Sequence, residues 1–171
     1  PEDMTKVWGN ITKHIEKAEE AARRKNYDGA IALYHQLLDL HPNSGRARSG
    51  LREVLLLRVK RKKSSKLAAI PLLSVGIGRL LRQHQVVARG LERYLVNDPL
   101  NLRRNLQLGE ALEQAGHGNS AIAVYQFAGA LDSGSAAAWK RAGALLRDKG
   151  EVADALEALE KALEEIFREA E

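Results

Sequence analysis

The C-terminal part of the chain repeats itself at an interval of 34 residues. At this shift residues 105–112 align with residues 139–146, and Gly116 falls on Gly150. Self-similarity at a period in this range is the signature of a helix–turn–helix unit that cannot bury its apolar face alone. Such units stack on one another to form a continuous core. The interval therefore predicts an array of antiparallel helix pairs, and it constrains the fold more than any other feature of the sequence.

Small residues occupy fixed places in the two copies, and each place has a packing reason. Gly109 and Gly143 fall where the first helix of a pair crosses the second, and Ala121 and Ala155 fall opposite them. Small side chains let two helix axes approach to about 8–10 Å. The glycine that follows each first helix suits a left-handed C-terminal cap. These positions are expected to serve packing, so they say little about function.

This pattern resembles the tetratricopeptide repeat (TPR) family. Pro42 and Pro99 each end a copy, as the last position of the family motif usually does. Four copies are expected, at residues 11–44, 68–100, 102–135 and 136–168. The resemblance implies a single all-α domain over residues 1–171, with antiparallel helix-pair repeats stacked in a right-handed TPR-like solenoid. The repeats are interrupted by one extra inserted helix, which is basic and lies within residues 45–66.

The spacing of apolar residues gives the bounds of the expected helices. They cover residues 11–25, 28–40, 45–62, 67–82, 85–97, 101–114, 119–131, 136–148 and 152–168. Proline suits the first turn of a helix rather than its middle, so Pro71 predicts that the fourth helix begins near Ile70. Residues 1–10 are expected to be a lead-in before the first helix.

Residues 45–66 interrupt the regular spacing and carry most of the positive charge. They hold nine Lys and Arg residues against Glu53 alone, a charge of +8, whereas the whole chain carries +5. The densest part is a candidate basic patch formed by Arg58, Lys60, Arg61, Lys62, Lys63 and Lys66. Such an asymmetry of charge can mark a binding surface. We expect an acidic counterpart, either the Glu-rich C-terminal helix of a second copy or a partner protein.

Two other functions for this segment stay open on the sequence. With the apolar stretch 67–78 it could form a homo-oligomer contact, or it could bind an anionic membrane or another polyanion peripherally. The stretch offers 12 uncharged residues before Arg79, whereas a membrane span needs roughly 20. Polybasic segments also attract nucleic-acid phosphates, but no aromatic residues are interleaved here for base stacking. Nucleic acid is therefore not expected as a partner, and membrane contact is not favoured.

No set of residues in the sequence supports catalysis. The five histidines are scattered, and none forms a His-Glu-x-x-His motif. The chain has no cysteine, which excludes disulfides and thiolate metal sites. Together with the lack of a visible signal peptide, this favours a cytoplasmic location. Gly76 and Gly78 begin like a dinucleotide fingerprint, but Leu81 occupies the third glycine position. We therefore expect no catalytic residues, no metal site and no cofactor.

The TPR resemblance implies a concave groove lined by the first helix of each pair. Some members of the family hold a C-terminal carboxylate there with a lysine, asparagine and arginine set, from which this chain departs. The groove is expected to be mixed in character, with Leu72, Arg79, Arg103, Leu106, Glu110, Glu113, Lys140 and Arg147. Such a surface favours an extended or helical peptide bound by shape and a few charges. The expected function is a non-enzymatic interaction scaffold or adaptor for a peptide or protein of unknown identity.

Overall fold

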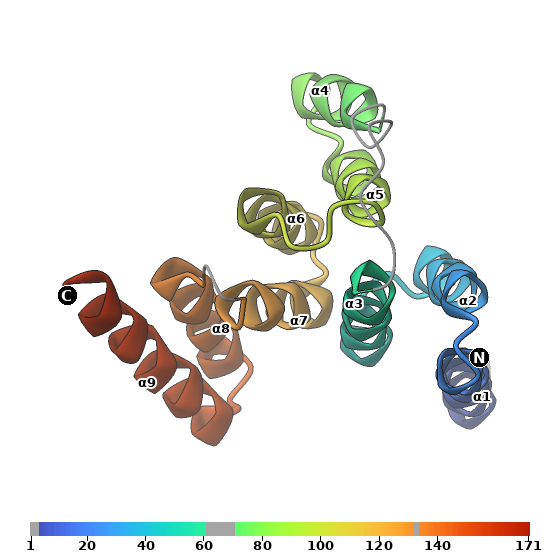
Figure 1. The fold of residues 1–171 in the computed structure, drawn as a ribbon, viewed down its shortest axis with the longest axis horizontal. Helices are drawn as coiled ribbons and strands as arrows, with labels where there is room; N and C mark the ends of the chain where they lie inside the picture. The colour runs from blue at the N-terminus through green and yellow to red at the C-terminus, as the bar shows by residue number, and fades with distance from the viewer. Residues whose placement is uncertain (1–3, 61–70, 132–133) are drawn as a thin grey trace.

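The computed structural model describes residues 4–60, 71–131 and 134–171, and in these ranges the chain forms nine α-helices and no strand (Figure 1). The helices are α1 (Met4–Arg23), α2 (Tyr27–Leu40), α3 (Gly45–Val59), α4 (Leu72–Leu80), α5 (His84–Leu95), α6 (Leu102–Gln114), α7 (Gly118–Gly129), α8 (Ala136–Asp148) and α9 (Val152–Glu169). The all-α, helix-pair architecture expected from the repeat is confirmed.

Most helices pack on their neighbours in sequence. The pairs α1–α2, α4–α5, α6–α7 and α8–α9 are antiparallel hairpins, and α5 packs on α6 and α7 on α8 to join consecutive pairs. The exception is α3, which packs on α2 and then on α7, far along the chain, rather than on α4 (Figure 1). The α1–α3 unit is therefore attached to the side of an array that runs from α4 to α9.

The first helix is longer than the sequence reading suggested. It begins at Met4, so the expectation that residues 1–10 form a lead-in is wrong. The apolar residues Met4, Val7, Ile11, Ile15 and Ala18 follow one another at spacings of three or four, which is the helical period. This pattern continues without a break through the segment that we expected to lie outside the helix.

A shared C-terminal cap ends the first helix of every pair. Gly116 and Gly150 have positive φ values of 79° and 82°, as the sequence predicted. The amide of the next residue bonds back across the cap, for example from His117 to the carbonyl of Leu112 (2.8 Å), as in a Schellman motif. Lys25 and Arg82 take the same left-handed conformation without the freedom of glycine.

Close approach explains the glycines inside the first helices. A Cβ atom on Gly109 would lie 2.5 Å from a ring carbon of Tyr125 on α7. On Gly143 it would lie 2.9 Å from the side chain of Leu159 and 3.3 Å from the carbonyl oxygen of Ala155. Both glycines therefore lie at a helix crossing, where any side chain would push the two helices apart.

The buried residues form two clusters that correspond to the two parts of the fold. The smaller joins α1, α2 and α3 and includes Tyr34 and Leu51. The larger runs from α4 to α9 and includes Leu95, Leu108 and Trp139. Among the helices in the described ranges, none has the length and apolar character needed to span a bilayer.

The inserted helix is shorter than expected and is part of the core. The sequence placed a basic helix within residues 45–66, and α3 ends at Val59 with Lys60 as its C-cap. Its N-terminus is fixed by Ser44, whose hydroxyl accepts a hydrogen bond from the amide of Ala47 (3.3 Å). The remainder of the segment, residues 61–66, lies outside the described residues.

Candidate functional site

A surface cavity of about 540 Å³ lies between α6 and α8, over α7. Its lining residues are Arg103, Leu106, Gln107, Glu110, Glu113, Gln114, Tyr125, Ala137 and Arg141. Four of the eight residues that we expected in a partner groove, Arg103, Leu106, Glu110 and Glu113, are among them. Two walls of the cavity are formed by α6 and α8, and each of these is the first helix of its pair.

Glu113 organises one wall of this cavity. It accepts a hydrogen bond from the hydroxyl of Tyr125 (3.2 Å) and forms an ion pair with Arg141 on the next first helix. Burial, followed by the nearby charge of Glu110, raises the pKa of Tyr125 to about 12. Tyr125 is therefore neutral at physiological pH, and its hydroxyl donates the hydrogen bond to Glu113.

The opposite charges at the rim are available to a ligand. Arg103 and Glu110 are exposed, and neither forms an ion pair within the described part of the chain. They are seven residues apart on α6, which corresponds to about 10 Å along the helix axis. Between them, Leu106 is half-buried and packs against the core. The arrangement offers one positive and one negative contact on either side of an apolar surface.

The other predicted groove residues do not line this cavity. Leu72 packs against the core from α4, and Arg79 is exposed on the same helix. Lys140 and Arg147 are exposed on α8, and Arg147 forms an ion pair with Asp148 (2.9 Å). The structure thus divides the predicted set into four residues that share one cavity and four that do not.

The sequence reading missed five lining residues of the cavity: Gln107, Gln114, Tyr125, Ala137 and Arg141. Arg141 lies 34 residues after Gln107 and so occupies the same place in the repeat, and both were missed. Lys140 was named because it corresponds to Leu106 at this shift. The next residue of α8, whose side chain is rotated by about 100° around the helix, lines the cavity instead. Tyr125 belongs to a second helix, where no groove residue was sought.

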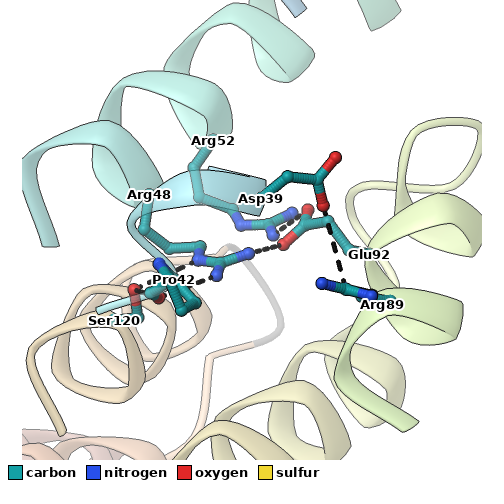
Figure 2. Close-up of polar contacts among 7 residues, drawn as sticks. All are labelled: Asp39, Pro42, Arg48, Arg52, Arg89, Glu92 and Ser120. Carbon is teal, nitrogen blue, oxygen red and sulfur yellow. Dashed lines mark hydrogen bonds and ion pairs between the residues drawn. The ribbon is translucent and has the colours of Figure 1, made fainter. Parts of the chain in front are cut away.

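A second set of charged residues lies inside the protein, where α3 meets α5 (Figure 2). Glu92 on α5 forms ion pairs with two arginines of α3: with Arg48, at 2.5 Å, and with Arg52. All three side chains are buried, and Arg52 is 1% exposed. Burial alone would raise the pKa of Glu92, but the charges of Arg52 and Arg48 outweigh it and hold the pKa below its usual value.

The two arginines are not equally satisfied. Arg48 also donates to the hydroxyl of Ser120 on α7 (3.4 Å) and to the carbonyl of Pro42 (3.2 Å), so all three of its nitrogens have a partner. Arg52 donates to Glu92 through one nitrogen, and its other two have no partner. Arg48 therefore joins α3 to both α5 and α7, whereas Arg52 joins it to α5 (Figure 2).

A smaller cavity of about 250 Å³ adjoins this buried cluster. Its polar lining includes His35, Arg48, Arg89 and Glu92, and Arg89 forms an ion pair with Asp39 at 3.8 Å. Burial lowers the pKa of His35, with the two buried arginines acting in the same direction. Because Glu92 pairs with both buried arginines and Arg48 also bonds to Ser120 and Pro42, we interpret the cluster as a structural junction and not as a binding site.

The described part of the basic segment is largely occupied by contacts inside the chain. Arg58 forms an ion pair with Asp28 (2.9 Å) and donates to the carbonyl of Val96. Arg46 forms one with Glu19 (3.3 Å). Two residues of the basic patch, Arg58 and Lys60, are in the described ranges, and of these two Lys60 forms no ion pair. The patch residues Arg61, Lys62, Lys63 and Lys66 lie outside the described residues.

No group of three or more histidine, aspartate or glutamate residues in the described ranges is arranged to hold a metal ion. The two charged clusters also contain no serine, threonine or cysteine beside a base of the kind that nucleophilic catalysis requires. The lining of the α6–α8 cavity offers an apolar surface, hydrogen-bonding groups and charges of both signs.

Comparison with known proteins adds information on the fold. No protein-family model and no curated protein sequence matches the chain. The crystal structure of MamA aligns over 90% of this chain and 96% of its own, with a TM-score of 0.54 and 20% identity. A structure described as MamA MSR-1 C2 aligns over 94% and 98%, with a TM-score of 0.52 and 16% identity.

A third structure is that of YrrB, described as a TPR protein with an unusual peptide-binding site. It aligns over 95% of this chain and 92% of its own, with a TM-score of 0.49 and 19% identity. The two MamA structures, with TM-scores above 0.5, show a common fold, and identities this low leave function and partners open. With its 34-residue period, its capped helix hairpins and its glycines at the helix crossings, the chain is a helix-pair solenoid of the tetratricopeptide-repeat type.

Proposed function

We propose that this protein is a non-enzymatic interaction scaffold that binds a partner peptide in the α6–α8 cavity. The observation that supports the proposal is the lining of that cavity, where exposed charges of opposite sign flank a half-buried leucine on one helix. Concave sites with an apolar floor and a few placed polar groups are the usual form of binding sites in proteins.

The spacing of the charges indicates what kind of peptide fits. Arg103 would pair with an acidic side chain of the ligand, and Glu110 with a basic one. The two are about 10 Å apart along α6. Side chains on one face of an extended strand recur every second residue, so residues i, i+2 and i+4 span about 13 Å, which the long side chains of Arg103 and Glu110 can follow. A short peptide with an acidic and a basic side chain in this spacing, and an apolar side chain between them over Leu106, matches the surface best.

Selection from a displayed peptide library, followed by fluorescence anisotropy with the selected peptides, tests this proposal. We expect the double substitution Arg103→Ala and Glu110→Ala to weaken binding by about tenfold or more, since each ion pair at a partly desolvated site contributes around 1 kcal/mol. The matched control is Lys140→Ala with Arg147→Ala, which removes two exposed charges of α8 that do not line the cavity. Equal losses in the two double variants, or no loss in the first, would contradict the proposal.

A further inference from the structure

The array from α4 to α9 has an exposed apolar stripe at each end. On α9 the stripe is formed by Val152, Leu156, Leu159, Leu163, Ile166 and Phe167. On α4 it is formed by Leu73, Ile77, Leu80 and Leu81. The buried residues lie on another side of each helix: Val75 and Gly78 on α4, and Ala155, Ala158 and Ala162 on α9. Leu159 lies at the edge of the α9 stripe, since its side chain also lies against Gly143 of α8. In Figure 1 the two stripes lie on helices at opposite ends of the array.

The repeat itself shows what covers a stripe like that of α9. At the 34-residue shift, Leu156 and Leu163 of α9 correspond to Ile122 and Gly129 of α7. Ile122 is 6% exposed, whereas Leu156 is 59% exposed. In α7 these positions are covered because the first helix of the next pair, α8, packs there and brings the ring of Trp139 against Gly129. The stripe of α9 is thus the surface on which the array receives another first helix.

The stripe of α4 is the complementary surface. At the same shift, Ile77 of α4 corresponds to Ala111 of α6, which is 3% exposed. Ala111 lies on the side of α6 away from Gly109, since two residues rotate a helix by about 200°; Gly109 faces α7, so Ala111 faces α5. Ile77 is 61% exposed because α3 packs on α7 instead of preceding α4 in the array. The stripe of α4 is the surface on which a first helix receives a preceding second helix.

The charges around the two stripes are opposite. The α9 helix has six acidic residues and two basic ones, a net charge of −4. Residues 71–83, which hold α4 and the turn after it, have Arg79 and Arg82 and no acid. Pairing α9 with α9 of another copy would bring two acidic helices together, whereas pairing α9 with α4 brings opposite charges together.

We propose that α9 of one copy packs on α4 of a second copy, so that the array continues from molecule to molecule. The lengths agree, since nine residues of α4 extend over about 14 Å and the stripe from Leu156 to Leu163 over about 10 Å. The contact joins two different surfaces, so it is heterologous and produces rings or open chains rather than a simple two-fold dimer. It does not depend on the α6–α8 cavity.

Sedimentation velocity of residues 1–171 over about 5 to 500 μM tests this proposal. The wild-type protein is expected to form species larger than a monomer as the concentration rises. Leu156→Glu with Leu163→Glu on α9, and Leu73→Glu with Ile77→Glu on α4, should each reduce association by at least about tenfold. The control is Leu40→Glu with Leu100→Glu, which changes two exposed leucines outside the stripes and should leave association unchanged.

Mixing the two stripe variants gives the decisive result. The α9 variant keeps an intact α4 and the α4 variant keeps an intact α9, so the mixture should form a one-to-one dimer that neither variant forms alone. Circular dichroism of each variant verifies that its helices are retained, and dimer formation in the mixture shows directly that both are folded. A monomeric wild type at the highest concentration, an α4 variant that associates normally, or a mixture without dimer would each overturn the proposal.

Discussion

The buried cluster of Glu92, Arg48 and Arg52 leads to a quantitative prediction for stability. Glu92→Gln keeps the shape of the side chain but leaves two buried arginines without a counter-charge. Removing one partner of a buried ion pair typically costs about 3–5 kcal/mol, because the remaining charge is poorly solvated. For a chain of this size each kcal/mol lowers the melting temperature by about 2–4 °C, so we expect a decrease of roughly 6–20 °C.

Urea denaturation followed by circular dichroism measures the free energy of unfolding of this variant. The control is Arg24→Gln, which breaks an exposed i,i+4 ion pair with Glu20 (2.7 Å) and should cost no more than about 0.5 kcal/mol. If Glu92→Gln cost as little as the control, the cluster would not hold α3 to α5. Replacing all three charged residues with leucine or methionine should recover most of the loss, since no unpaired charge then remains.

The same contacts predict which of the two arginines contributes more to stability. Arg48→Met should lower the free energy of unfolding more than Arg52→Met does. Arg48 has partners on both α5 and α7, whereas Arg52 already has two nitrogens without a partner.

The dependence of stability on acid pH follows from the lowered pKa of Glu92. A carboxylate with a lowered pKa in the folded state stabilises the protein above its unfolded-state pKa of about 4.3, and this contribution is lost as pH falls through the folded-state value. The loss should be absent in Glu92→Gln.

Four further substitutions test other parts of the fold. Gly109→Ala places a Cβ atom against the ring of Tyr125 and should destabilise by about 1–3 kcal/mol in urea denaturation, whereas an unchanged midpoint would show that the crossing is not close. Lys25→Gly and Arg82→Gly relieve a left-handed conformation and should each stabilise by up to about 1 kcal/mol; destabilisation by either would contradict the assigned cap. His35 has a lowered pKa, so wild-type stability should decline as pH falls below about 6.5, and His35→Leu should remove this decline; a decline that persists would place the titration elsewhere.

The helices could be predicted from the sequence because their signals are local. We predicted the helix bounds from the apolar period, the 34-residue shift and the glycine and proline residues that end helices. These bounds agree with the structure within a few residues, except at the start of α1. The same shift located the glycines at the crossings and the caps. Half of the predicted groove residues lie together because α6 occupies its expected place in the array.

The position of α3 could not be derived in this way, because its contacts join residues far apart in sequence. Arg48 and Arg52 were counted as part of a basic surface, whereas their partner Glu92 lies 44 and 40 residues further along the chain. One signal was available: Pro42 aligns with Pro99 at a shift of 57 residues, which places Arg48 at the position of the buried Asn105. Charged residues at such positions require a buried counter-charge, and the sequence does not say which one.

A charge exchange at Arg103 tests whether the α6–α8 cavity binds a peptide through Arg103 and Glu110. The affinity of a selected peptide is measured by fluorescence anisotropy for the wild type and for Arg103→Glu, using the peptide itself and a version in which its acidic residue is changed to lysine. We expect Arg103→Glu to weaken binding of the original peptide by about tenfold or more, and the lysine peptide to recover most of this loss of affinity. If both peptides bound the variant equally weakly, or if Arg103→Glu had no effect, Arg103 would not contact the ligand and the proposed site would be wrong.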